Sequence, residues 1–335
     1  MAMITTIVNN NIQRRAAFKI VEQLAERLSN RLPSTLILNT VIPSSGDIGQ
    51  YLHQIAVKLN QAKTAESIIM TSWFEPPWVT EQARIIDSIL TTEKRPWIRL
   101  GYGTKHPNDV FFDFWALCFE QLRPQYTMSD LLPVSTPSKL YLNQNRSPAP
   151  HKAQLFNQLN TLGYLDCGFV SHIDRLIEEE LTDYTEELSF GIPTNVPNDP
   201  YTLGGMQVWK NHVLTIVSDS MPPGAKKYGN IVLSEKFYKP IIGLRPFLIN
   251  GNPDNVRFLK QQGFDLFEDV FEFDVNNYDQ HQVILKTLGK LQHLTPAQRY
   301  EWYVKLLPRL EFNLAHFQQY VAMQYEILDT VVVMR

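Results

Sequence analysis

The feature that most constrains the fold is an alternation of short, β-rich apolar runs with helical segments along the first 125 residues. Strands are expected over residues 4–8, 35–41, 67–71 and 96–102, and helices around residues 17–28, 55–59, 79–90 and 109–122. Strands separated by helices of about 10–15 residues indicate βαβ units and a mainly parallel sheet.

A stretch containing Pro and Ser, residues 131–138, interrupts this rhythm and is the expected linker. The alternation then resumes. Strands are expected over residues 139–143, 168–171, 212–217, 230–233 and 246–250, and helices over 150–162, 173–188, 234–243, 253–262 and from about 295 onward. Residues 190–202 hold three prolines and are expected to form a long loop bordering a cleft.

The pattern therefore predicts an α/β fold with two Rossmann-like, doubly wound domains that face a cleft. The expected boundaries are 1–135 for an N-terminal domain, 136–295 for a C-terminal domain, and 296–335 for C-terminal helices packing across both. Parallel sheets of this kind bind ligands at the carboxyl ends of their strands. Many classes of protein share such a fold, so it does not fix the function.

The composition of the chain excludes several classes of protein. The chain has 335 residues, 44% hydrophobic and 19% charged, as in an ordinary globular protein of about two domains. A net charge of −3 gives no general basic bias toward nucleic acid. Two cysteines are too few for a disulfide framework. With no signal-peptide pattern and no apolar run near about 20 residues, we expect a soluble, cytoplasmic protein without a membrane partner.

The start of the expected helix 234–243 carries the most informative side chains. Ser234 is a favourable N-cap, and Glu235 and Lys236 follow in the first turn. A phosphate there would meet free backbone N–H groups and the positive end of the helix dipole. Gly251, after the next expected strand, lacks a Cβ and would let a ligand approach closely. The alternative is a solvated first turn and a simple chain reversal.

Two segments carry a resemblance to a known family. The sequence SEKFYKPIIGLRPFLING at residues 234–251, followed by RFLKQQGF at 257–264, resembles the donor-binding segment of GT-B-type glycosyltransferases. Fucosyltransferases have a shorter relative of it, and the fuller pattern is similar to glycosyltransferase-like proteins of phages and large viruses. The sequence YLNQNRSPAPHK at residues 141–152 resembles the strand, loop and helix that open the second domain in this group.

The resemblance implies that residues 1–135 form the acceptor domain and residues 136–295 the nucleotide-sugar donor domain, and it implies a role for each matching residue. Glu235 would hold the nucleotide ribose, Lys236 would contact the diphosphate, and Arg146 would supply a second, forked cation. Asn143 and Asn145 would add polar contacts at a strand end. Ser234, Lys239 and Gly251 complete the expected donor site, although Lys239 and its neighbour Tyr238 would equally suit packing.

The same resemblance bears on catalysis. GT-B enzymes often work without a metal, and no D-x-D triplet stands at an expected strand end, Asp219 being the nearest carboxylate to such a place. We therefore expect no metal and no cofactor, with a UDP- or GDP-sugar as co-substrate. An inverting enzyme would also need an acceptor-side base. Glu75, His106 and Asp109 are the candidates, together with Asp47.

The leading hypothesis is a hexosyl- or pentosyltransferase, in the host cytoplasm if the chain is viral. The viral resemblance favours double-stranded phage DNA with a hydroxymethylated pyrimidine as the acceptor, which would need cations near the cleft. Lys94, Arg95, Arg99 and Lys105 are candidates, with stacking aromatics in residues 73–78. A glycan or small-molecule acceptor and a non-catalytic nucleotide-binding protein remain alternatives. A different nucleotide-using enzyme is disfavoured, because the two common glycine-rich phosphate motifs are missing.

Overall fold

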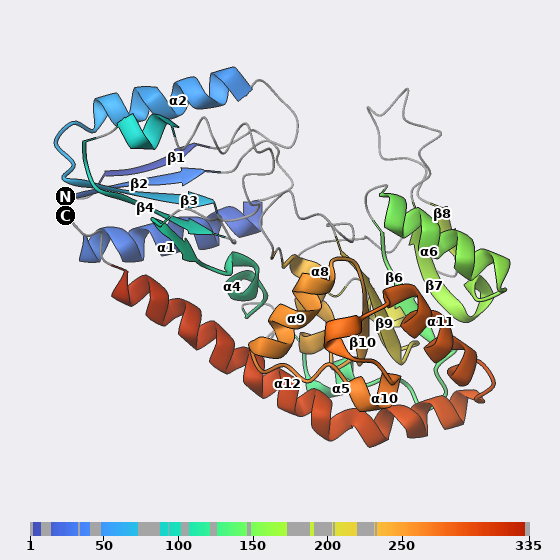
Figure 1. Ribbon diagram of the computed structural model, residues 1–335. Coiled ribbons are helices and arrows are strands. Elements are labelled where there is room, and N and C mark those ends of the chain that lie inside the picture. Colours follow the sequence, from blue (N-terminus) through green and yellow to red (C-terminus); the bar gives the residue numbers. More distant parts are fainter. Residues whose placement is uncertain are drawn as a thin grey trace. The chain divides into compact units, whose positions relative to one another are not determined.

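The computed structural model divides into two compact units (Figure 1). Unit 1 comprises Met1–Cys118, Lys226–Leu233 and Val321–Arg335, and unit 2 comprises Phe119–Ala225 and Ser234–Tyr320. The structure describes residues 3–7, 15–32, 34–40, 48–72, 88–92, 94–101, 107–120, 126–145, 149–172, 188–190, 203, 205–219, 231 and 233–331. Each unit contains a five-stranded sheet in which parallel pairs dominate, so the predicted mixed α/β class is confirmed.

Unit 1 is built on an all-parallel sheet in the order β1-β2-β3-β4-β5. Its strands are β1 (Met3–Ile7), β2 (Thr35–Thr40), β3 (Ser67–Ser72), β4 (Trp97–Gly101) and β5 (Asp109–Phe111). Its helices are α1 (Arg15–Arg31), α2 (Ile48–Gln61) and a helical segment at residues 88–92, followed by α4 (Phe114–Glu120), which ends across the unit boundary.

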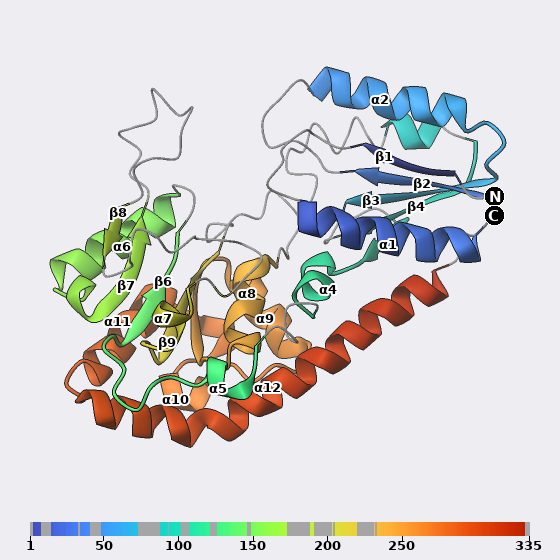
Figure 2. The same ribbon diagram turned by 180° about the vertical axis from the view of Figure 1, so that it is seen from behind.

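Both faces of this sheet are buried. Helices α1 and α2 lie on opposite faces, as the two opposite views agree (Figures 1 and 2). On one face Leu36, Leu38 and Met70 pack with Ile55 of α2 in a single apolar cluster. A sheet covered on both sides needs apolar residues at successive strand positions, which explains the continuous apolar runs of the sequence.

The structure of unit 1 differs from the sequence-based predictions in two respects. Residues 109–111 form strand β5, and the helix begins only at Phe114, because Asp109 pairs in register with Arg99 of β4. Consecutive strands are neighbours throughout, so the strand order of this sheet has no reversal of the doubly wound kind. Most of the helix expected at 79–90 lies outside the described residues.

Unit 2 has the strand order β10-β9-β6-β7-β8, in which only β8 is antiparallel to its neighbour. The strands are β6 (Tyr141–Asn143), β7 (Gly168–His172), β8 (Leu188–Phe190), β9 (Leu214–Ser218) and β10 (Phe247–Asn250). The chain leaves β6 toward β7 and later returns to β9 on the other side of β6. This reversal places a topological switch point at the carboxyl ends of β6 and β9.

The helices of unit 2 are α5 (Met128–Leu131), α6 (Pro150–Thr161), α7 (Met206–Trp209), α8 (Glu235–Ile242), α9 (Pro253–Gln261), α10 (Glu268–Phe271), α11 (Gln280–Leu291) and α12 (Pro296–Thr330), with 3₁₀ turns at Leu165–Cys167 and Val275–Asn277. Helices α6, α8, α9 and α12 lie close to their predicted positions, whereas α5, α7, α10 and α11 were not predicted. Two predictions are wrong at described positions: Leu188 begins β8 instead of ending a helix, and Ile231 and Leu233 are not in a strand. The rest of the helix expected at 173–188 and most of the loop at 190–202 lie outside the described residues.

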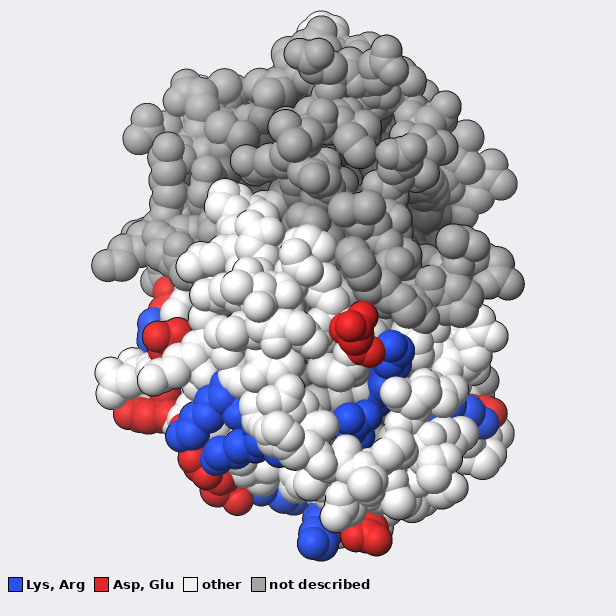
Figure 3. Space-filling view, turned by 90° about the vertical axis from the view of Figure 1, so that its right-hand side faces the viewer, with Lys and Arg blue, Asp and Glu red and all other residues white. Residues whose placement is uncertain are grey.

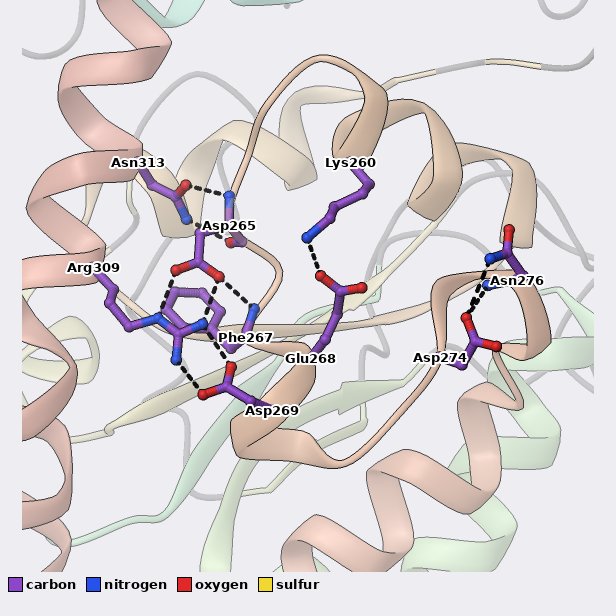
Figure 4. Close-up of polar contacts among 9 residues, drawn as sticks. All are labelled: Lys260, Asp265, Phe267, Glu268, Asp269, Asp274, Asn276, Arg309 and Asn313. Atoms are coloured by element: carbon purple, nitrogen blue, oxygen red, sulfur yellow. Dashed lines mark hydrogen bonds and ion pairs between the residues drawn. The ribbon is translucent and has the colours of Figure 1, made fainter.

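A charged network fastens α12 within unit 2 (Figure 4). The Arg309 guanidinium donates two hydrogen bonds to Asp265, at 2.6 and 2.7 Å, and two more to Asp269. It also stacks over the Phe267 ring, 5.1 Å from its centroid. Asn313, one turn further on, accepts from the Asp265 N–H and donates to its carbonyl. The planar fork of arginine suits such a double carboxylate contact.

Arg245 is a fully buried cation that has a structural role. Its guanidinium donates to the backbone carbonyls of five residues and lies over the rings of Trp209 and Tyr303. The five carbonyl partners are Leu131, Trp209, His212, Gly243 and Leu244. Burial lowers the pKa of Arg245 to about 10, which leaves it charged at neutral pH. This arginine ties α5, α7 and the end of α8 together at the edge of the sheet where β9 and β10 begin.

None of the described helices combines the length and the apolar character that crossing a membrane requires.

Candidate functional site

A pocket opens at the switch point of the unit 2 sheet. Its walls come from the carboxyl-terminal halves of β6 and β9 and from the first turn of α8; they include Gln144, Ser218, Glu235, Lys236 and Lys239. Helix N-termini present unpaired backbone N–H groups and a partial positive charge. The pocket therefore combines a positive helix end with charged side chains at the place where open α/β sheets bind ligands.

Glu235 and Lys236, the first two residues of α8, form an ion pair inside this pocket. Lys236 Nζ lies 2.6 Å from Glu235 Oε1, and the two side chains are 16% and 9% exposed. Burial alone would raise the pKa of Glu235, but Lys236 and Lys239 outweigh it, so the pKa lies below its usual value. Glu235 is therefore ionised at neutral pH and is available as a hydrogen-bond acceptor.

Lys152, in the first turn of α6, adds a third buried lysine to this region. It is 1% exposed. Burial, reinforced by the charge of Lys236, lowers the pKa of Lys152 to about 8, while Asp219 and Glu235 act in the opposite direction. Among the described residues of this region, three lysines (Lys152, Lys236 and Lys239) lie near the two carboxylates of Glu235 and Asp219. A poorly solvated group of cations is a favourable environment for an anion.

Asn143 and Asn145 occupy the end of β6, as predicted, and cross-link the sheet there. Asn143 donates to Ile216 O at 2.8 Å and to Ser218 Oγ at 2.9 Å, both on β9. Asn145 donates to Asn143 Oδ1 and to Ser171 O on β7, each at 2.9 Å. This row of polar contacts fixes three neighbouring strands at the floor of the site.

Ser234 and Gly251 have different local roles from those expected. Ser234 is the N-cap residue of α8 by backbone conformation, but its hydroxyl makes no capping hydrogen bond. The packing of the protein itself requires a residue without a Cβ at Gly251, because a Cβ at this position would lie 2.2 Å from Asp219 Cβ. The space beside Gly251 is therefore filled by Asp219.

Asp219 is fully buried at the end of β9 and is held by the segment that follows β10. Its Oδ2 accepts from Asn255 Nδ2 at 2.6 Å and from the backbone N–H of Asn252 at 3.5 Å. Within the described residues, no group of three or more His, Cys, Asp and Glu side chains has a metal-binding arrangement.

His151 borders the same region from α6. Its Nε2 lies 3.0 Å from the carbonyl oxygen of Asp219, which can only accept, so Nε2 carries the proton and Nδ1 is an acceptor. Burial lowers the pKa of His151 to about 4, with a smaller contribution in the same direction from Lys152 and His281. The imidazole is therefore neutral at physiological pH.

The structure describes only some of the residues that were expected on the acceptor side. Asp109 forms a buried ion pair with Arg99, at 2.8 Å, so its carboxylate is engaged and Arg99, 4% exposed, is not part of a basic surface. Arg95 donates to the carbonyl oxygens of Ala62 and Leu59 beside the end of α2. The other expected site residues lie outside the described part of the chain: Arg146, Glu75, His106, Asp47, Lys105 and residues 73–78.

Charges of both signs are interspersed on the described surface. Figure 3 shows one face on which Lys and Arg side chains lie next to Asp and Glu side chains between larger uncharged areas. In unit 2, Lys286 and Lys290 both pair with Glu272. The described part of this face therefore does not present a field of a single sign.

The sequence analysis did not single out three polar residues that are buried at the carboxyl edge of the unit 2 sheet: Lys152, His151 and Asn250. The lysine and the histidine follow Pro150, which marks a helix start, and that start after β6 was the available signal. Their burial depends on the return of the chain to β9 and β10, which no local pattern specifies.

Comparisons of the chain with protein-family models, with curated proteins and with solved structures gave no match.

Proposed function

We propose that the chain is a glycosyltransferase of the GT-B type that takes its sugar from a nucleotide-sugar donor bound in unit 2. The observation that carries the proposal is the buried Glu235–Lys236 pair at the start of α8, at the switch point of the sheet. Lys152 and Lys239 increase the positive charge there. A nucleoside diphosphate matches this charge and the N-terminus of α8.

Each charged residue then has a role in the reaction. On donor binding, Lys236 would exchange its contact with Glu235 for one with the diphosphate, and Glu235 would accept hydrogen bonds from the ribose diol. In transfer, negative charge develops on the leaving diphosphate, and fixed cations and helix N–H groups stabilise it. With Asp109 engaged by Arg99, Glu75 and His106 are the better candidates for the acceptor-side base.

The proposed acceptor is a hydroxyl compound. The DNA hypothesis invoked four cations near the cleft: Lys94, Arg95, Arg99 and Lys105. Two of them are engaged inside the protein, since Arg99 is buried and Arg95 donates hydrogen bonds to carbonyl oxygens. A hydroxymethylated pyrimidine in phage DNA is therefore no better supported as the acceptor than a glycan or a small molecule. Parallel assays of sugar transfer to each of these acceptors would identify the acceptor.

The donor site is tested by titrating the protein calorimetrically with UDP, GDP, UDP-glucose and GDP-mannose. Lys236→Ala is expected to weaken binding of the preferred diphosphate at least about tenfold, the effect of losing a charge-assisted contact of about 1.5–3 kcal/mol. Lys260→Ala is the control, because Lys260 is exposed and pairs with Glu268 on α10. Equal affinities for wild type and Lys236→Ala would refute the donor site. Binding without donor hydrolysis or transfer would indicate a non-catalytic nucleotide-binding protein.

A further inference from the structure

A second pocket lies in unit 2 between α10, α11 and the first part of α12. Its volume is about 90 Å³, and the apolar part of its lining consists of Val270, Phe271, Leu291 and Trp302. The Phe271 and Trp302 rings lie 6.4 Å apart, tilted by 49°. An apolar cavity of about 150 Å³ can hold a benzene ring, so this pocket admits part of one ring or a short aliphatic chain.

Two lysines of α11 are the charged residues among the described lining of this pocket. Lys286 and Lys290 are four positions apart, hence on one face of the helix, and both pair with the carboxylate of Glu272, which ends α10. Each ammonium has three N–H donors and uses one of them on Glu272, so donors remain for a ligand. Two cations and one carboxylate leave a net charge of +1 at the rim of the pocket, which matches a monoanion.

The wall that α10 contributes has an unusual backbone conformation at both ends. This helix of four residues is bracketed by Phe267 and Glu272, whose φ angles of 59° and 56° are left-handed. That conformation is costly for a residue with a Cβ. Both ends are fastened, because Arg309 stacks over the Phe267 ring (Figure 4) and the two lysines hold the Glu272 side chain. Backbone strain of this kind is concentrated at ligand clamps and other functional sites, which supports a binding role for the pocket.

We propose that this pocket binds a small organic monocarboxylate. An aromatic ring or short aliphatic chain of the ligand would pack beside Phe271 and Trp302. The ligand carboxylate would accept charge-assisted hydrogen bonds from both Lys286 and Lys290. Polyanions are disfavoured, because Glu272 already neutralises one of the two lysines. The inference is independent of the proposed function, since the pocket at the switch point shares no lining residue with this one.

Ligand-observed NMR titrations of the full chain at neutral pH test the site with phenylacetate, hexanoate and the neutral phenylacetamide. Both carboxylates are expected to bind saturably, with a Kd of about 1 mM, the range typical of ligands of this size. Phenylacetamide has the same ring without the charge, so it should bind at least about fivefold more weakly than phenylacetate.

Variants at the rim of the pocket show whether the two lysines hold the carboxylate. The double variant Lys286→Gln/Lys290→Gln should weaken both carboxylates at least about tenfold and leave phenylacetamide within about twofold of wild type. Glu272→Gln removes the competing carboxylate and should strengthen phenylacetate about twofold to fivefold. Lys260→Gln is the matched control, because Lys260 is as exposed as Lys286 and pairs with Glu268 of α10 outside the pocket.

The proposal is refuted if neither carboxylate binds saturably to the wild type, or if phenylacetate and phenylacetamide bind equally well. Unchanged affinity for phenylacetate in the double variant would also refute it. Displacement of phenylacetate by UDP or GDP would assign the probe to the switch-point pocket, which overturns this site and leaves the donor site standing. Failure of both diphosphates to bind would refute the donor site alone. Should the double variant unfold, as judged by circular dichroism, Glu272→Gln and the comparison with phenylacetamide still decide the question.

Discussion

The fold buries the imidazoles of His151 and His212 in their neutral form, so the free energy of unfolding depends on pH. Burial lowers the pKa of His151 to about 4 and that of His212 well below 6.5, the latter with help from Arg245. The unfolded chain binds more protons than the folded chain between about pH 4 and 6.5. These residues therefore contribute stability that is complete above about pH 6.5 and is lost as the pH falls.

We predict that His151→Gln flattens this acid dependence. Between pH 6.5 and 4.5 the free energy of unfolding of the wild type should fall more steeply than that of the variant, by up to about 1.4 kcal/mol per pH unit, the effect of one proton. Urea titrations at several pH values measure both slopes. Parallel slopes would show that His151 titrates normally in the folded protein.

At the scale of elements, substitution by alanine should destabilise the protein at one of two glycines that lie next to aromatic rings and have little effect at the other. A Cβ on Gly243, which ends α8, would lie 2.0 Å from Cζ2 of buried Trp209, whose indole N–H donates to Gly243 O. On Gly289, inside α11, it would lie 3.3 Å from the Tyr164 hydroxyl, a close contact that a small shift of the Tyr164 side chain would relieve. Gly243→Ala is thus expected to cost about 2–3 kcal/mol through overpacking.

Gly289→Ala is the matched comparison. The gain in helix propensity, up to about 1 kcal/mol, should offset the closer contact with Tyr164, so its melting temperature should stay within a few degrees of wild type. Thermal unfolding followed by circular dichroism compares the two variants. Similar melting temperatures would mean that α7 and α8 are not packed as tightly as Trp209 indicates.

Elements with a strong local pattern could be predicted. The apolar run at β9 and the helix after Asn252, which accepts from the Asp254 N–H as an N-cap, both lie close to their expected bounds. Residues 109–111 could not be predicted, because their strand depends on pairing with β4 and their own sequence is short. Strand order is equally non-local, which is why the consecutive order in unit 1 was not expected.

The candidate site, like the strand order, could be predicted only where it depends on adjacent residues. The place of Glu235 and Lys236 at a helix start could be predicted, because adjacent residues mark such a start. The burial of Lys152 and Asn250 could not, because it depends on distant strands that come together at the switch point. Gly251 was assigned to the right turn for the wrong reason, since Asp219 occupies the space beside it.

At the scale of the whole molecule, the proposed donor site has cations in the place where a metal could otherwise neutralise a bound diphosphate. Lys152, Lys236 and the N-terminus of α8 supply fixed positive charge in a poorly solvated site. We therefore predict that the affinity for the preferred diphosphate is the same, within about twofold, in excess EDTA and in millimolar Mg²⁺ or Mn²⁺. Release of diphosphate from the nucleotide sugar should likewise continue in EDTA.

Calorimetry under both conditions, with an assay of diphosphate release, measures this. The control is Lys236→Ala: it removes one of the fixed cations, so any metal assistance should become larger in the variant than in the wild type. Loss of binding or turnover by the wild type in EDTA, restored by Mn²⁺, would overturn the prediction. Asp219, the buried carboxylate at the end of β9, would then be the first ligand to test, by Asp219→Asn.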